Sequence, residues 1–231
     1  MSDYQSLNNA HFNSTAGDYD SSPQAKEMTE HACGAVLQEF TALTSEEHVK
    51  NASVLEFGCG TGLCAFEVAS KVKNLLGVDV SEGMLGHLNH KLMTNPENEH
   101  IRDKVKTVLY QIKPDAPLPE PEFSQYLAGS EGGFDMIFSN HVMHHIENVQ
   151  AVVDILAKEM LKKDGNEMST TKDMQALNNE HFNNTAQDYD KLPQVKEFTK
   201  RAAEVIVQEF IDSTNEEHVK NAIVLDLGCG T

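Results

Sequence analysis

A glycine-rich loop, Gly58-Cys59-Gly60-Thr61-Gly62, follows an apolar run in this 231-residue chain. Because glycine has no side chain, a ligand can lie against the bare backbone of such a loop. The amides that open the next helix then face the anionic groups of the ligand. A tight turn without any ligand would also explain these three glycines. The loop alone therefore leaves a binding site and a simple turn both open.

An acidic residue stands at a distance from this loop that suits a nucleoside ligand. Asp79 lies 21 residues after Gly58, near the end of the apolar run at residues 75–80. A carboxylate at that place can accept hydrogen bonds from both hydroxyl groups of a ribose. The alternative is that Asp79 only starts the helix beyond Ser81. An acid on an otherwise apolar strand needs a polar partner, which favours the ribose role.

The spacing of the glycines distinguishes between two kinds of nucleoside cofactor. Dinucleotide-binding loops place their third glycine three residues after the second. Leu63 occupies that place here, and Gly62 comes only two residues after Gly60. The spacing therefore disfavours NAD.

Four segments resemble class I methyltransferases that depend on S-adenosylmethionine (SAM). VLEFGCGTGL and GVDVSEGML resemble the first two motifs of this family, and FDMIFSNHVMHHIENV resembles its fourth. HFN…A…YD near the N-terminus resembles a helical lid that places an aromatic side chain over the cofactor. The resemblance covers residues 3 to about 164 and is nearest to the small-molecule group that includes the ubiquinone and menaquinone biosynthesis C-methyltransferases.

The resemblance implies how the first two motifs would bind SAM. Gly58, Cys59 and Gly60 should contact the methionine and ribose parts of the cofactor through their backbone. Glu56 should order the ammonium end, and Asp79 should hold the ribose.

The remaining cofactor residues implied by the resemblance come from three other segments. Val80 and Met84 should flank the adenine, Asn140 should lie beside the methionine part, and Tyr19 should close over it. The implied activity is methyl transfer from SAM to an unidentified small molecule.

His141, His144 and His145 form a cluster that could hold a metal ion or act as a general base. No set of Cys or carboxylate residues stands at matching ligand spacing, so we predict pocket lining or packing at a helix start, and no metal. Methyl transfer from a charged sulfonium depends largely on proximity and orientation, and a base is optional. We therefore predict no specific catalytic residue.

Apolar patterns between the motifs predict alternating strands and helices. Strands are predicted at residues 54–57, 75–80, 105–112 and 134–139. Helices are predicted from Ser22-Pro23 to about residue 40, and at residues 63–72, 81–92 and 146–163, with a capping box of Thr44 and Glu47 opening a short turn. The alternation predicts an α/β fold, a Rossmann-like doubly wound parallel sheet.

The sequence also contains a long internal repeat. A shift of 170 positions aligns residues 3–61 with residues 173–231 without a gap, and 36 of the 59 pairs are identical. We therefore predict a methyltransferase domain at residues 1–164, a junction at 165–172, and a truncated N-terminal part of a second domain at 173–231. The second copy contains no ribose acid and should not bind SAM by itself.

The first copy departs from the family pattern after residue 164. Family members continue into strands 5 to 7, whereas the chain reads NEMSTT at residues 166–171. The predicted sheet is therefore incomplete, with strands 1 to 4 and an open edge on the fourth. We predict that residues 223–227 dock beside residues 134–139 in the place of strand 5. A non-catalytic remnant that at most binds SAM or a protein partner is the alternative to an active enzyme.

Composition narrows the partners and the location. The formal net charge of -18 repels nucleic-acid phosphates and anionic lipid headgroups, so neither is expected as a partner. No apolar stretch reaches the roughly 20 residues that a membrane helix needs, and no secretion signal is present. Cys33, Cys59, Cys64 and Cys229 have no Cys-x-x-Cys spacing, so we expect reduced thiols and a cytoplasmic protein. The sequence contains no indication of the oligomeric state.

Overall fold

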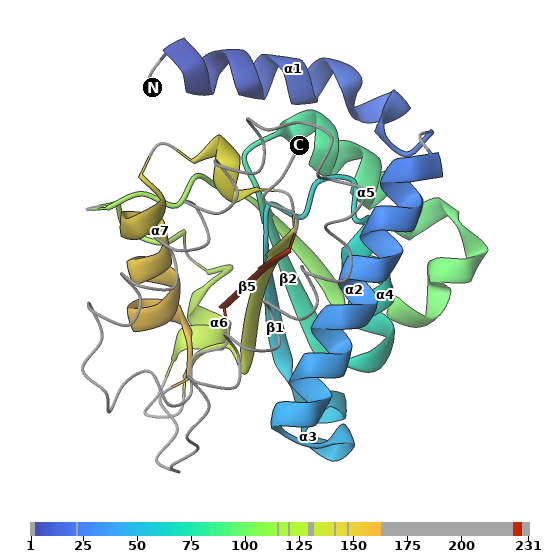
Figure 1. The fold of residues 1–231 in the computed structure, drawn as a ribbon, viewed down its shortest axis with the longest axis vertical. Helices are drawn as coiled ribbons and strands as arrows, with labels where there is room; N and C mark the ends of the chain where they lie inside the picture. The colour runs from blue at the N-terminus through green and yellow to red at the C-terminus, as the bar shows by residue number, and fades with distance from the viewer. Residues whose placement is uncertain are drawn as a thin grey trace, which may run out of the picture.

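The computed structural model describes eight segments of the chain, at residues 3–21, 23–114, 116–119, 121–128, 132–140, 142–146, 148–162 and 224–227. In these segments a parallel sheet lies between two layers of helices (Figure 1). Its strands have the order β3-β2-β1-β4-β5. The strands are β1 (Ser53–Phe57), β2 (Asn74–Asp79), β3 (Val105–Leu109), β4 (Met136–Asn140) and β5 (Val224–Leu227).

Helices connect these strands and cover both faces of the sheet. The α-helices are α1 (Asp3–Tyr19), α2 (Pro23–Leu43), α3 (Glu46–Asn51), α4 (Leu63–Lys71), α5 (Glu82–Thr94), α6 (Ser124–Leu127) and α7 (Val149–Ile155). Short helices of other types are the 3-10 helices η1 (Pro96–Ile101) and η2 (Met143–His145) and the π-helix η3 (Leu156–Met160). In the part of the chain that the structure describes, none of the helices combines the length and the apolar content needed to cross a membrane.

The strand order brings the functional motifs to one edge of the sheet. β1 is central and pairs in parallel with β2 on one side and with β4 on the other. Since parallel strands end at the same edge, the segments that follow Phe57, Asp79 and Asn140 meet there. Ligands bind at this edge in doubly wound sheets, next to the point where the strand order reverses.

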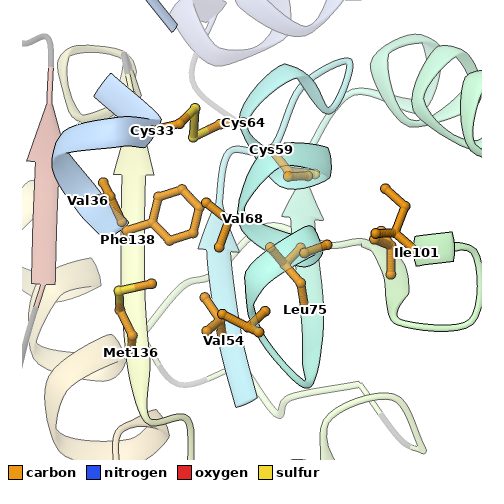
Figure 2. Packing of buried hydrophobic residues seen from close by; sticks show 14 of the residues in the cluster. Cys33, Val36, Val54, Cys59, Cys64, Val68, Leu75, Ile101, Met136 and Phe138 are labelled. Carbon is orange, nitrogen blue, oxygen red and sulfur yellow. A yellow bond between two sulfur atoms is a disulfide. The ribbon is translucent and has the colours of Figure 1, made fainter. Parts of the chain in front are cut away.

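Two apolar clusters hold the helices on the sheet, because β1, β2 and β4 are buried on both faces. One cluster joins the sheet to α2, α4, α5 and η1, and Figure 2 shows Phe138 of β4 packed in it. The other joins the opposite face to α7, η3 and the segment around Phe123. α1 lies across the carboxyl ends of the strands, outside the two layers on the faces of the sheet, and contacts α5 (Figure 1).

The predicted elements are confirmed, with shifted boundaries. β3 ends at Leu109, three residues earlier than predicted. β4 begins at Met136, because Phe134 forms a separate bridge with Leu161. The predicted helix at 146–163 is divided into α7 and η3, and η2 precedes them.

The predicted cap of α3 is wrong by one residue. Ser45 is the capping residue, since its hydroxyl accepts a hydrogen bond from the His48 amide at 3.1 Å. The Thr44 hydroxyl instead donates to the Phe40 carbonyl of α2. Only Thr44 has a glutamate three residues later, as a capping box requires, whereas Ser45 is followed there by His48, so the sequence pattern favoured the wrong residue.

The predicted docking of a strand from the second copy is confirmed. β5 pairs in parallel with β4, from Ile137 opposite Val224 to Asn140 opposite Leu227. The predicted junction at 165–172 lies outside the described residues, and so does the rest of the second copy. The domain boundaries therefore stay predictions.

The expectation of reduced thiols is wrong for two of the four cysteines. Cys33 of α2 and Cys64 of α4 form a disulfide, shown as the yellow bond in Figure 2. Packing of α2 on α4 places their Cα atoms 5.6 Å apart, within the range of disulfides. Their separation of 31 positions in the sequence conceals this proximity. Cys59 is a buried free thiol, and Cys229 lies outside the described residues.

Candidate functional site

The glycine loop between β1 and α4 has a backbone that requires glycine. Gly58, Gly60 and Gly62 have φ angles of 76°, 50° and 86°, in the left-handed region. A Cβ atom at Gly58 would lie 2.2 Å from a methyl group of Val142, and one at Gly62 would lie 2.7 Å from Leu88. Two of these glycines therefore permit close packing. A Cβ at Gly60 would have no neighbour within 4 Å, so this residue faces open space.

Asp79, at the end of β2, is joined to the loop by hydrogen bonds. One carboxylate oxygen accepts from the Gly60 amide at 2.8 Å, and the other accepts from the Ser81 amide at 2.8 Å. Burial raises the pKa of Asp79, and the backbone amides of Ser81, Gly60 and Val80 oppose this rise. Each carboxylate oxygen can accept a second hydrogen bond, so the side chain can still bind a pair of hydroxyl groups.

Glu56 of β1 is buried, and its Oε2 atom has no hydrogen-bond partner in the described part of the chain. Burial raises the pKa of Glu56 well above its ordinary value, and the charge of Asp79 raises it further. The Oδ1 atom of Asn140 is likewise buried without a partner among the described residues. Unpartnered polar atoms in a protein interior are costly, so both atoms indicate a place for a polar ligand.

Cys59 has a similar electrostatic environment. Burial raises the pKa of its thiol well above the ordinary value, and the charges of Asp79 and Glu56 raise it further. A thiol in such a place stays protonated and is a poor nucleophile. The Cys59 side chain contacts the bare Cα of Gly77 in β2, where a Cβ would lie 2.7 Å from the sulfur.

All nine residues predicted for the cofactor line one cavity of about 430 Å³. This volume suits a small molecule, since ligand pockets measure roughly 300–1,000 Å³. The sequence reasoning did not single out several other residues that line it, namely Phe12, Thr61, Tyr110, Ile112, Val142, Ile146 and Val152. Phe12 and Val142 lie within motifs quoted above, whereas Ile112 and Val152 carry only the apolar pattern of buried residues. The cofactor roles of the nine residues stay predictions.

α1 contributes aromatic side chains to this cavity. Phe12 lines it and meets the ring of His145 edge to face, with the ring centres 5.0 Å apart. Tyr19 also lines it while keeping 40% of its surface exposed. Burial raises the pKa of the Tyr19 hydroxyl, and the charges of Asp20 and Asp79 add to this effect.

The histidine cluster is only partly described. His145 lines the cavity, whereas His141 and the side chain of His144 lie outside the described part of the chain. Among the residues that the structure describes, no three His, Cys, Asp or Glu side chains come together as metal ligands would. The absence of a metal therefore stays a prediction.

The sheet is doubly wound and parallel, a glycine loop follows its central strand β1, and an acid ends the neighbouring strand β2. This combination defines a nucleoside-binding class of α/β proteins. Residues 28–210 match the family described as methyltransferase domain. This match covers most of the chain and crosses the predicted junction at 165–172. The chain therefore belongs to the methyltransferase domain family.

Several known proteins are similar to this chain. An uncharacterized methyltransferase of Schizosaccharomyces pombe is 29% identical over 139 residues, which cover 55% of this chain and 44% of that protein. The chain thus spans less than half the length of this relative.

Among solved structures, magnesium protoporphyrin IX methyltransferase from Synechocystis PCC 6803 with bound SAM aligns with a TM-score of 0.47. It is 19% identical, and the alignment covers 69% of this chain and 73% of that one. The YcgJ protein of Bacillus subtilis aligns with a TM-score of 0.42 at 22% identity, over 59% of this chain and 48% of that one.

Proposed function

We propose that this protein binds SAM in the cavity and transfers its methyl group to a small molecule. The observation that carries the proposal is the glycine loop joined through the Gly60 amide to Asp79, beside the buried and unpartnered Oε2 atom of Glu56. Membership in the methyltransferase domain family supports the same activity.

The residues around the cavity fit the chemical groups of SAM. Asp79 has free lone pairs for the ribose hydroxyls, and the loop exposes backbone at Gly60, where a side chain would extend into open space. The ammonium group of the methionine part is a suitable partner for Glu56, because a buried carboxyl with a raised pKa is stabilised as the anion by a nearby cation. Asn140 would supply an acceptor beside the same group.

The other predicted residues would bind the adenine and cover the site. Val80 and Met84 follow Asp79 in the lining and would flank the adenine, and Tyr19 would close over the methionine part. When bound, SAM supplies an activated methyl group on a positively charged sulfur. The protein would hold the acceptor in line with this group and exclude water from it.

The lining also indicates the kind of acceptor. Away from the loop the cavity is lined mainly by apolar and aromatic residues, including Phe12, Val142, Ile146 and Val152. Lys113 also lines the cavity, but the two acids of the site and the net charge of -18 outweigh this one cation and disfavour an anionic acceptor. We infer a small, largely apolar and uncharged acceptor, and no nucleic acid.

Calorimetric titration with SAM and with its demethylated product tests this proposal. The Asp79→Ala variant should bind SAM about 1–3 kcal/mol more weakly, the scale for lost hydrogen bonds to a charged group. Asp103→Ala, which removes an exposed acid, is the matched control and should bind like the wild type. A wild type that does not bind SAM would contradict the proposal. If Asp79→Ala bound SAM as tightly as the wild type, only the assignment of Asp79 to the ribose would be wrong. SAM binding without methyl transfer to any acceptor would favour a non-catalytic protein.

A further inference from the structure

Helix α1 covers the cavity, but its described side chains, at residues 9–19, offer little apolar surface to hold it there. Among these described side chains, Ala16 is the one apolar residue that is fully buried. Phe12 is half-buried, and Tyr19 is 40% exposed. Most helices in proteins are stabilised by packing an apolar face, so polar contacts contribute much of what holds this described part of α1 in position.

Asp20, directly after α1, makes two such contacts. One carboxylate oxygen accepts a hydrogen bond from the hydroxyl of Thr61 in the glycine loop, and the other forms an ion pair with Lys91 of α5. Thr61 is buried, with 2% of its surface exposed. The Lys91 ammonium group also lies over the ring of Phe66 in α4, 5.4 Å from its centre. Asp20 is thereby joined to the loop and, through Lys91, to two helices.

The contact with Thr61 connects α1 to the residues proposed for the cofactor. Thr61 directly follows Gly60, whose amide donates to Asp79. Asp20 directly follows Tyr19, which lines the cavity. A single carboxylate thus joins the end of the covering helix to the loop that would hold the ribose and methionine parts of SAM.

A second polar contact fixes the middle of α1. The Oδ1 atom of Asn13 accepts hydrogen bonds from the Ser81 hydroxyl and the Gly83 amide, each at 2.8 Å. The backbone of α1 approaches α5 closely here, because a Cβ at Gly83 would lie 2.7 Å from the Asn13 carbonyl oxygen. Asn13 therefore fixes the adjacent Phe12 as Asp20 fixes Tyr19.

We propose that Asp20 is a positioning residue that holds α1 over the cavity through the Thr61 hydroxyl, so that Tyr19 and Phe12 form part of the binding site. This role deepens the proposed function and rests on it. Loss of the Thr61 contact leaves Asp79 and Glu56 in place but loosens the end of α1 that carries Tyr19, while Asn13 still holds the middle of the helix.

The test compares hydrogen exchange of the α1 amides and SAM affinity in full-length variants. Asp20→Ala and Thr61→Val remove the two partners, and Thr61→Ser retains the hydroxyl. Loss of a charge-assisted hydrogen bond should speed α1 exchange roughly tenfold and weaken SAM binding by a similar factor. Asp18→Ala, which removes an exposed acid of the same helix, is the matched control.

The proposal predicts that Thr61→Ser behaves like the wild type. The double variant Asp20→Ala/Thr61→Val should be no worse than Asp20→Ala alone, which already removes the contacts of Asp20 with both Thr61 and Lys91. The proposal would be overturned if Asp20→Ala and Thr61→Val showed the same α1 exchange and SAM affinity as Asp18→Ala. Additive effects of the two substitutions in the double variant would also overturn it. If Asp20→Ala does not fold, the comparison of Thr61→Val with Thr61→Ser decides. Hydrogen exchange is measured without ligand, so it tests the role of Asp20 in holding α1 even if the wild type does not bind SAM. A wild type that does not bind SAM would contradict the proposed function only.

Discussion

Two carboxyl groups at the cavity have different environments, although they lie on neighbouring strands. Asp79 accepts hydrogen bonds from two backbone amides, which oppose the effect of burial on its pKa. Glu56 is fully buried, and its pKa is raised well above the ordinary value. Hydrogen bonds to the charged form stabilise it, and desolvation does the reverse. Asp79 is thus suited to bind hydroxyl groups as an anion, and a cation beside Glu56 would stabilise its charged form.

The buried Glu56 should make the stability of the ligand-free protein depend on pH. Because folding raises the pKa of Glu56 above 4.5, its stabilising contribution is present below pH 4.5 and is lost as the pH rises through the folded-state pKa. We predict that Glu56→Gln unfolds at a higher temperature than the wild type at neutral pH, and that this difference shrinks towards pH 4.5. Thermal unfolding followed by circular dichroism at several pH values measures the difference.

Glu56→Gln should also bind SAM more weakly than the wild type, because a neutral amide cannot form an ion pair with the ammonium group of SAM. Glu67→Gln, which changes an exposed acid of α4, is the control and should match the wild type in both measurements. A difference between Glu56→Gln and the wild type that stays constant with pH would show that the pKa of Glu56 is not raised.

A polar cluster around Asp135 joins several elements at the edge of the sheet where β1 and β4 begin, opposite the edge that carries the cavity. The Asp135 carboxylate, 7% exposed, accepts a hydrogen bond from the Ser53 amide at the start of β1 and pairs with Lys162 after η3, each at 2.7 Å. His48 of α3 lies 3.7 Å from the same carboxylate. One side chain therefore connects β1, α3 and the segment after η3 at the start of β4.

We predict that Asp135→Ala lowers the free energy of unfolding by about 1–3 kcal/mol, because it leaves a buried amide and a half-buried ammonium group without this acceptor. Chemical denaturation measures the change. Asp154→Ala removes the ion pair of Asp154 in α7 with Lys158 in η3, together with a hydrogen bond from Gln150, and should cost about 1 kcal/mol or less because these groups are largely solvated. Equal effects of the two substitutions would show that the Asp135 cluster contributes no more than a surface ion pair.

Across the whole molecule, β4 lies between two strands of repeated sequence. A shift of 170 positions places Val54–Phe57 on Val224–Leu227, and β4 pairs in parallel with both segments. The two pairings differ in register, since Ile137 lies opposite Leu55 on one side and opposite Val224 on the other. β5 therefore covers the edge that β4 would otherwise expose, as expected for an apolar strand in the place of strand 5.

We predict that deletion of residues 173–231 lowers the melting temperature and increases aggregation, because β4 then becomes an uncovered apolar edge. Differential scanning fluorimetry and light scattering, with the full chain as reference, measure the two effects. A shortened protein as stable and soluble as the full chain would show that β5 is dispensable. The Asp79 contacts with Gly60 and Ser81 lie away from this edge, so residual SAM binding by the shortened protein is the expected secondary result.

The alternating strand and helix patterns of the sequence determined the class of fold and the edge of the sheet at which the cofactor would bind. The runs that became β1, β2 and β4 are mainly apolar, as is typical of strands buried on both faces. The loop at Gly58 follows β1 directly, and Asp79 is the last residue of β2. Parallel strands end at one edge, so chain order alone was enough to bring the two motifs together.

Tertiary packing decided the features that depend on residues distant in sequence. The Cys33–Cys64 disulfide requires α2 to lie on α4, and no spacing in the sequence indicates that contact. The contacts of Asp20 with Thr61 and Lys91 join residues 41 and 71 positions apart. The boundary of β4 depends on the bridge between Phe134 and Leu161. Local sequence patterns indicate which face of a helix or strand is buried. Contacts between residues distant in sequence depend on how the layers pack, and only the folded structure defines that packing.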